Sequence, residues 1–232
     1  MNKTVIYAAV AAIVVSSAAY VYFGQSETPL TGISPAGAGN KSEETNKGDV
    51  NAIKDTDMVH GSKDAPVTLV EYASMTCPHC AAFQKEVVPA LNKDYVETGK
   101  VKLVFREFPL DAIARMASAV ARCLKGDAYF SFVDLLFANQ QDWIKRSASG
   151  QYTKESILEG LSQMGKQAGM PSDKVEACAD DMANLALVDA NWKEGQDLYK
   201  VNSTPSFFIN GTSHGPMAYD DLKKVLDDLI KK

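Results

Sequence analysis

Two cysteines separated by two residues stand between a strand-like segment and a helix-like segment, and this arrangement constrains the fold more than any other part of the sequence. Residues 67–72 form an apolar run that ends shortly before Cys77. Apolar residues recur with a helical period after Cys80, as at Phe83 and Leu91. A strand, a short loop and a C-x-x-C motif that opens a helix are together typical of a thiol redox centre. The sequence therefore predicts an α/β fold with a redox-active cysteine pair beside the end of a strand.

The start of a helix favours the thiolate form of a cysteine. The first four N–H groups of a helix have no partner inside the helix, and together with the helix dipole they stabilise an anion. We expect Cys77 to be the nucleophile, because the thiolate is the form that attacks a disulfide. Cys80, within the first turn, is expected to be more buried and to resolve the mixed disulfide. Pro78 suits the first turn, where its missing N–H costs nothing, and a protonated His79 would add a positive charge near either sulfur.

The same motif could instead form a structural disulfide or half of a metal site. A zinc site of four cysteines normally contains two closely spaced pairs. The other two cysteines, Cys123 and Cys178, stand alone in the sequence, so we expect no metal and no other cofactor. The net charge is −5 and the sequence has no basic run, which argues against nucleic acid as a partner.

The N-terminal residues 1–23 have the pattern of an export signal. Lys3 precedes the uncharged residues 5–23, and no Lys or Arg follows before Lys41. A cleaved signal peptide has an apolar core of about 7–15 residues and then small residues, which Ser17, Ala18 and Ala19 would supply. An uncleaved anchor needs about 20 apolar residues, and aromatic residues often lie at its membrane interface, as at residues 20–23. Both interpretations export the rest of the chain.

Residues 24–57 differ in composition from the rest of the chain. They are rich in Gly, Ser, Thr, Asn, Lys and Glu and contain almost no aromatic residue. Such a segment buries too little apolar surface to offset the entropy of ordering. We therefore expect a flexible linker over 24–57, followed by one domain over 58–232.

The order of strand and helix patterns in this domain indicates a sheet interrupted by helices. Strands are expected at 67–72 and 101–106, with a helix from Cys80 to about residue 97 that Pro89 should kink or interrupt. About residues 111–200 then show five helical stripes, one of them with Thr153 as its N-cap. A strand at 206–209, an Asn-Gly hairpin turn, a short strand at 212–214 and a closing helix follow. This order predicts a sheet domain with a helical insertion.

Glu71 is the one charged residue on the strand before the cysteines. It falls on the same face as Val67 and Leu69, so we expect a buried carboxylate with no evident cation. Burial raises the pKa of a carboxyl group. Such a group near Cys80 could relay the proton that Cys80 gains or loses during exchange. The alternative is a solvated glutamate at the edge of the sheet.

Four segments together resemble the DsbA proteins, which are periplasmic thiol:disulfide oxidoreductases. Cys77-Pro78-His79-Cys80 is the active-site sequence typical of that family. Residues 64–72 resemble its strand before the active site, 105–110 the end of its next strand, and 203–211 its cis-proline loop and following strand. The resemblance extends from roughly residue 58 to the C-terminus. It implies a thioredoxin fold with an inserted helical domain.

The resemblance also assigns expectations to single residues. The family has an acid at the position of Glu71, and its proline at the position of Pro205 is cis. A cis bond would expose the backbone of Thr204 beside Cys77, where an extended substrate could pair with it. Some DsbA relatives carry a second cysteine pair.

We expect a structural disulfide between Cys123 and Cys178. Both cysteines lie on apolar stripes of expected helices, and export places them in an oxidising compartment. Two buried free thiols are the alternative.

The expected function is donation of the Cys77–Cys80 disulfide to newly exported proteins in their reduced or unfolded state. The resemblance implies reoxidation by a DsbB-like membrane quinone reductase. We expect a monomer in the periplasm, either soluble after signal cleavage or tethered to the inner membrane. One alternative is a disulfide isomerase or reductase, although DsbC-type isomerases carry a dimerisation domain where this chain has the expected linker. The other is an envelope binding protein for unfolded chains whose cysteines are incidental.

Overall fold

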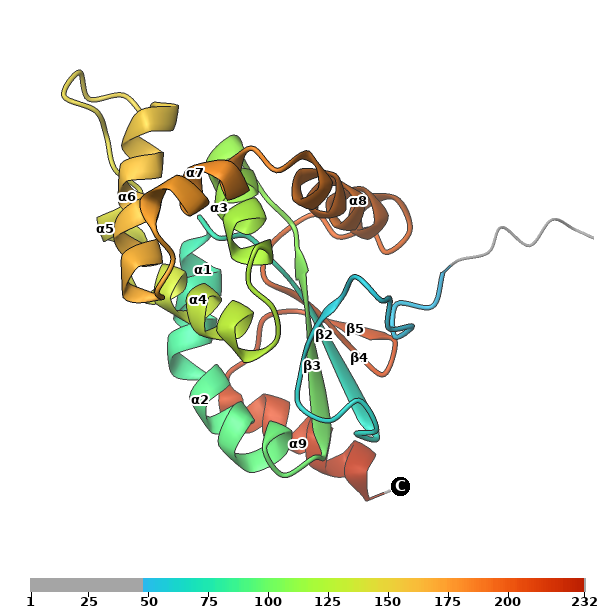
Figure 1. Cartoon of the computed structure of the whole chain (residues 1–232). Helices are drawn as coiled ribbons and strands as arrows, with labels where there is room; N and C mark the ends of the chain where they lie inside the picture. Colours follow the sequence, from blue (N-terminus) through green and yellow to red (C-terminus); the bar gives the residue numbers. More distant parts are fainter. Residues whose placement is uncertain (1–47, 232) are drawn as a thin grey trace, which may run out of the picture. The chain divides into compact units, whose positions relative to one another are not determined.

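The computed structural model describes residues 48–231, which contain a five-stranded mixed sheet (Figure 1). In chain order the strands are β1 (Met58–His60), β2 (Val67–Ala73), β3 (Val101–Glu107), β4 (Ser206–Ile209) and β5 (Thr212–His214). The spatial order is β1-β3-β2-β4-β5, so β2 is the central strand, parallel to β3 and antiparallel to β4. All seven residues of β2 are buried, as its apolar character on both faces predicts. The three residues of β1, which pair with β3, were not expected from the sequence.

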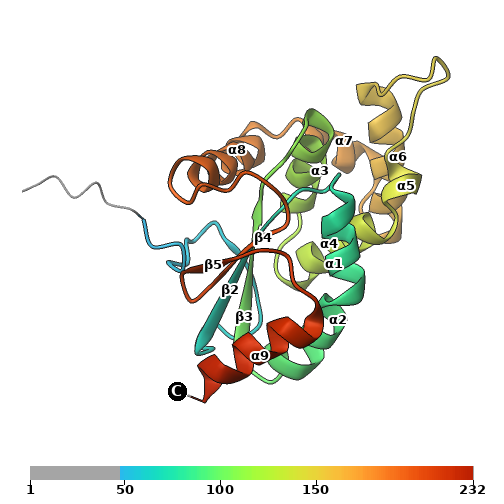
Figure 2. The same ribbon diagram turned by 180° about the vertical axis from the view of Figure 1, so that it is seen from behind.

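The helix after the cysteines is broken, as Pro89 predicts. Its parts are α1 (Pro78–Glu86), α2 (Val88–Leu91) and the π-helix η1 (Asn92–Val96). Pro89 lies in the first turn of α2, where a missing N–H is tolerated. These helices and α9 (Tyr219–Ile230) pack on one face of the sheet, where Phe83 and Leu222 contact the apolar side of β2 (Figure 2).

Within the described residues, six helices lie between β3 and β4, one more than the sequence predicts. They are α3 (Ala112–Arg122), α4 (Asp127–Ala138), α5 (Gln140–Trp143), α6 (Lys154–Gln167), α7 (Ser172–Ala179) and α8 (Met182–Asp197). The extra helix is the four-residue α5. Thr153 caps α6 as expected, since its hydroxyl accepts from the N–H of Ser156. A Cβ at Gly160 of α6 would lie 2.0 Å from the carbonyl oxygen of Trp143, so only glycine permits this contact of α5 with α6.

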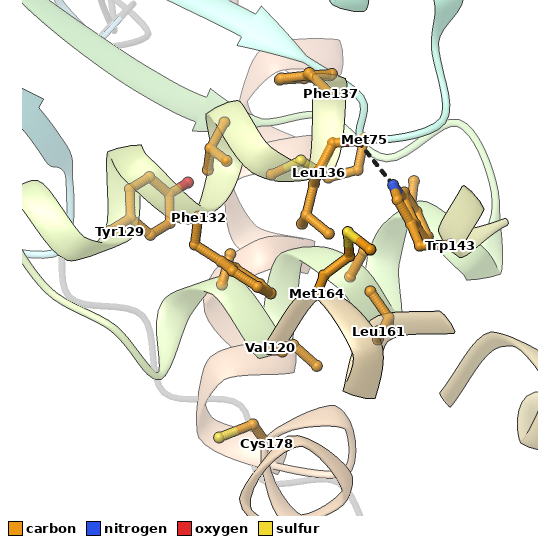
Figure 3. Packing of buried hydrophobic residues seen from close by; sticks show 14 of the residues in the cluster. Met75, Val120, Tyr129, Phe132, Leu136, Phe137, Trp143, Leu161, Met164 and Cys178 are labelled. Atoms are coloured by element: carbon orange, nitrogen blue, oxygen red, sulfur yellow. Dashed lines mark hydrogen bonds between the residues drawn. The ribbon is translucent and has the colours of Figure 1, made fainter. Parts of the chain in front are cut away.

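The inserted helices share a core with the active-site end of the sheet. Phe132 and Leu136 of α4 pack with Trp143, whose indole N–H donates to the carbonyl of Leu136 at 2.8 Å (Figure 3). Met75, just before the cysteines, belongs to the same cluster, as does Cys80 of α1. The inserted helices therefore pack directly against the cysteine pair and the residues just before it.

Residues 48–57, which we call the N-terminal strap, differ from the expected linker because they pack on the other face of the sheet. Arg106 of β3 is fully buried and donates to both carboxylate oxygens of Asp57, at 3.1 and 2.8 Å. It also donates to the carbonyls of Val50 and Ala52. These long-range contacts order a polar segment whose composition alone predicts flexibility. The remaining parts of the expected linker and signal, residues 1–47, lie outside the described residues.

Among residues 48–231, no helix combines the length and the apolar character needed to cross a membrane.

Candidate active site

The two cysteines of the motif lie at the start of α1. Cys77 is the N-cap with an extended backbone (φ −78°, ψ 120°), and Pro78 is the first helical residue. The carbonyl of Cys77 accepts from the N–H of Ala81, which places Cys80 in the first turn. Both cysteines are free thiols; Cys77 is 5% exposed and Cys80 is fully buried. This order of exposure is the one expected for a nucleophile and a resolving cysteine.

Hydrogen bonds lower the pKa of the Cys77 thiol to about 5. The largest contribution comes from the Cys80 thiol, which donates to the Cys77 sulfur. Burial opposes the shift, while the Thr204 side chain and the backbone N–H groups of Cys80 and His79 add to it. The side chain of His79 is exposed, and its contribution to the shift comes through the backbone.

The Cys80 thiol has the opposite shift. Donation to Cys77 raises its pKa, and burial and the nearby charge of Glu71 raise it further. Cys80 therefore keeps its proton under conditions in which Cys77 has lost its own.

The pairing of β2 with β4 brings a distant loop to Cys77. Tyr72 is opposite Ser206, so the residues just before β4 lie beside the end of β2. The Thr204-Pro205 bond is cis, and the Cys77 thiol donates to the carbonyl of Thr204 at 3.3 Å. Thr204 and Pro205 thus lie next to the cysteine pair, as the family resemblance implies.

Glu71 is fully buried, opposite Phe105 on β3 and Phe207 on β4. Neither of its carboxylate oxygens accepts a hydrogen bond from the described residues. Burial, followed by the negative charges of Asp134 and Cys77, raises its pKa to about 8. Glu71 is therefore not a solvated edge residue, and it carries a proton at neutral pH.

Side chains that no sequence pattern marks hold the turn before Cys77. Gln140 of α5 donates to the carbonyls of Met75 and Cys77 at 2.9 and 3.0 Å. Thr76 donates to Asp111, the N-cap of α3, at 2.7 Å. Nothing in the sequence marks Gln140, because it reaches the site only through the packing of the insertion.

A cavity of about 540 Å³ adjoins this turn. Two of its lining residues, Leu110 and Trp192, are large apolar side chains exposed to solvent. Its remaining apolar wall includes Phe108 and Val201, the latter three residues before Thr204.

The second cysteine pair lies away from the motif. Cys123, which ends α3, is joined by a disulfide to Cys178 of α7, with their Cα atoms 6.1 Å apart. The expected bridge is therefore present and links two inserted helices. Among the described residues, no cluster of His, Cys, Asp and Glu side chains has the arrangement of a metal site.

Comparison with known proteins agrees with this site. The family model described as thioredoxin matches residues 54–228. A Rickettsia prowazekii protein named as a protein-disulfide oxidoreductase is 34% identical over 180 residues, which are 77% of this chain and 63% of that protein. The chain thus spans less than two thirds of that relative. A protein of Bacillus cereus named as disulfide bond formation protein D is 30% identical over 74% of this chain and 78% of its own length.

A solved structure is also similar to this chain. Alpha-DsbA1 of Wolbachia pipientis has a TM-score of 0.69 and 26% identity, over 77% of this chain and 93% of that structure. The cysteine pair at the start of α1, the neighbouring cis-proline and the helices inserted between β3 and β4 agree with this similarity. The chain therefore belongs to the thioredoxin family and, within it, to the DsbA-like proteins.

Proposed function

We propose that the protein is a thiol:disulfide oxidoreductase that donates its Cys77–Cys80 disulfide to reduced proteins in the cell envelope. The observation that carries this proposal is the opposite shift of the two thiol pKa values, lowered to about 5 at Cys77 and raised at Cys80. A low thiol pKa stabilises the reduced pair and so makes the disulfide form a stronger oxidant.

The reaction has two exchange steps. A substrate thiolate attacks the Cys77 sulfur, the Cys77–Cys80 bond breaks, and Cys80 leaves and takes up a proton. A second substrate thiolate then attacks the substrate sulfur of the mixed disulfide, and Cys77 leaves as a thiolate. Two electrons pass from the substrate to the cysteine pair. Glu71, protonated at neutral pH, would supply the proton to Cys80.

The surroundings of Cys77 favour an extended polypeptide as the substrate. The carbonyl of Thr204, 3.3 Å from the Cys77 sulfur, is a backbone acceptor with which such a chain could pair, with little regard for sequence. The next residue, Pro205, has no backbone N–H that could occupy the Thr204 carbonyl or compete with the substrate. The apolar cavity beside Leu110 and Trp192 would take side chains that flank the substrate cysteine.

Membership of the DsbA-like proteins supports a proposal for the location and the recycling of the protein. We propose that the protein acts as a monomer in the periplasm, either soluble or tethered by residues 1–23, and that a DsbB-like membrane quinone reductase restores its disulfide.

The reduction potential of the Cys77–Cys80 pair tests this function against its alternatives. An oxidase should equilibrate with glutathione at a potential above about −180 mV, whereas a value near about −270 mV would indicate a reductase. Oxidation of a reduced, unfolded substrate protein should require Cys77, so the Cys77→Ser variant should be inactive. Equal effects of wild type and this variant on the substrate would indicate a binding protein instead. A Cys123→Ala/Cys178→Ala variant is the matched control, because it removes two cysteines outside the site.

A further inference from the structure

We propose that Asp134 of α4 carries protons between the buried Glu71 and solvent, by way of the surface cavity between α1 and α4. This inference rests on the proposed exchange function, and it adds to that function a relay residue that acts through Glu71.

The raised pKa of Glu71 calls for such a route. Each time Cys80 leaves the disulfide it takes a proton from Glu71, and because the pKa of Glu71 is about 8 in the reduced protein, Glu71 regains a proton at neutral pH. Glu71 is fully buried, and no described residue forms a hydrogen bond with its carboxylate oxygens. A carboxylate in this position needs a second group that has access to water.

Two packed aromatic rings connect the surroundings of Glu71 with the wall of a surface cavity. Phe105 is opposite Glu71 in the sheet, and its ring centre is 6.3 Å from that of Phe137 on α4. Phe137 and Asp134, one helical turn apart, both line a cavity of about 610 Å³. The opposite wall of this cavity includes Ala81, which directly follows Cys80. The cavity therefore lies between α1, from the residue after the resolving cysteine, and the exposed Asp134 of α4.

The charges of the two carboxyl groups are coupled. Asp134 is among the groups that raise the pKa of Glu71, so the two carboxyl groups lie within electrostatic range of each other. The surrounding protein also raises the pKa of Asp134, against the opposing effects of a hydrogen bond from Gln84 and the charge of His60. These shifts bring Asp134 closer to Glu71 in acidity than an isolated aspartate would be.

The other polar groups around this path are accounted for. Gln84, Lys85 and Glu86 of α1 line the cavity with Asp134. His60 of β1, which lies near Asp134, has its Nδ1 3.9 Å from a carboxylate oxygen of Asp127. Glu71 itself lies near the two cysteines and near the buried Tyr129 of α4, whose hydroxyl donates to Glu107. Asp134 is thus the carboxyl group that is both coupled to Glu71 and open to the cavity.

Every proton that Cys80 gains or loses is exchanged with solvent through Glu71 and Asp134. Glu71 gives its proton to Cys80 as the Cys77–Cys80 bond breaks. The Glu71 carboxylate then takes a proton from the Asp134 carboxyl group through a bridging water, and Asp134 regains a proton from solvent in the cavity. When the pair is reoxidised, the proton of Cys80 leaves by the same path.

The test compares Asp134→Asn with Asp127→Asn, a matched change on the same helix at a side chain that is 97% exposed. The rate at which the oxidised protein reacts with a substrate thiol is measured between pH 5 and 9 in dilute buffer. Asp134→Asn should be slower by at least about tenfold, a modest part of what general acid–base groups contribute. Added imidazole buffer, small enough for the cavity, should restore the rate of this variant and leave wild type and Asp127→Asn unchanged.

Three outcomes would overturn the relay. They are equal rates for the two variants, a slow Asp134→Asn that imidazole does not accelerate, and a shifted pH profile without any buffer dependence, which would reveal an electrostatic effect alone. Failure of the proposed function is distinguishable from these, because wild type would then show no exchange that depends on Cys77.

Discussion

At the scale of single residues, the acidity of Cys77 depends most on a hydrogen bond from the cysteine three residues later. The ultraviolet absorbance of the thiolate in reduced protein should rise with a midpoint near pH 5. Cys80→Ala removes the largest stabilising donor, so its midpoint should be higher than that of wild type. Cys77→Ser should show no transition in this range. A wild-type midpoint near about 8.5, the value of an ordinary cysteine, would contradict the arrangement of donors.

Glu71 should contribute to the stability of the reduced protein in a manner that depends on pH. Its pKa is raised from 4.5 to about 8 by folding, so the folded state retains a proton that the unfolded state has lost. The contribution of Glu71 to the free energy of unfolding should therefore fall as pH rises from about 4.5 to 8, by up to about 1.4 kcal/mol per pH unit.

Glu71→Gln removes this titration and separates the two roles of the residue. Urea denaturation should show the variant gaining stability relative to wild type across that pH range, while its exchange rate falls because Cys80 lacks a proton donor. Parallel stability curves would mean that Glu71 is ionised in the fold. Unchanged pH–rate profiles would remove it from the mechanism.

At the scale of elements, the N-terminal strap depends on one buried ion pair. The side chains of Arg106 and Asp57 are both fully buried. Asp57→Ala would leave the Arg106 charge without its carboxylate, which typically costs about 3–5 kcal/mol. Amide hydrogen exchange over residues 48–57 should become faster in this variant and remain unchanged in Asp55→Ala, an exposed neighbour. Equal protection in both variants would show that other contacts hold the strap.

The disulfide between α3 and α7 should affect stability without affecting exchange. It joins residues 55 positions apart, and removal of a bridge of this kind typically costs about 2–4 kcal/mol. The Cys123→Ala/Cys178→Ala variant should unfold at lower urea concentration and oxidise substrate at the wild-type rate. Mild reduction that opens Cys77–Cys80 should leave Cys123 and Cys178 closed to alkylating reagents. Alkylation of either residue in unreduced protein would contradict the bridge.

At the scale of the whole molecule, reduction of the active-site pair should change stability in a manner that depends on pH. In the reduced fold the pKa of Cys77 is depressed to about 5, so its stabilising contribution is complete above the ordinary cysteine pKa and is lost as pH falls through about 5. The oxidised protein has no such titration. The unfolding free energy of the reduced protein minus that of the oxidised protein should therefore increase as pH rises from about 5 to 9. A constant difference would indicate an ordinary pKa.

Local patterns made much of this fold predictable from the sequence. The burial of Glu71 followed from its place on an apolar face of β2, and the break after α1 followed from Pro89. Asn210 and Gly211 both have positive φ, as the Asn-Gly hairpin signal predicts. The position of Thr204 beside Cys77 was expected from a family resemblance, since no local pattern indicates it.

Features that depend on distant partners were not predictable. The strap is polar in composition and is ordered by a side chain of β3, about fifty residues away. β1 is three residues long and gains its regular structure by pairing with the edge of β3. Gln140 lies in a four-residue helix too short for a periodic pattern. Each of these becomes visible only when the tertiary contacts are known.

The pairing of β2 with β4 has a consequence for the order in which the chain is synthesised. β2 appears early, but its partner β4 and the Thr204 carbonyl follow only near the end, 127 residues after Cys77 in the case of Thr204. A growing chain that stops before residue 204 has one open edge on its central strand and lacks the carbonyl that accepts from the Cys77 thiol. The backbone acceptor beside Cys77 is therefore added to the site only after all the inserted helices have been synthesised.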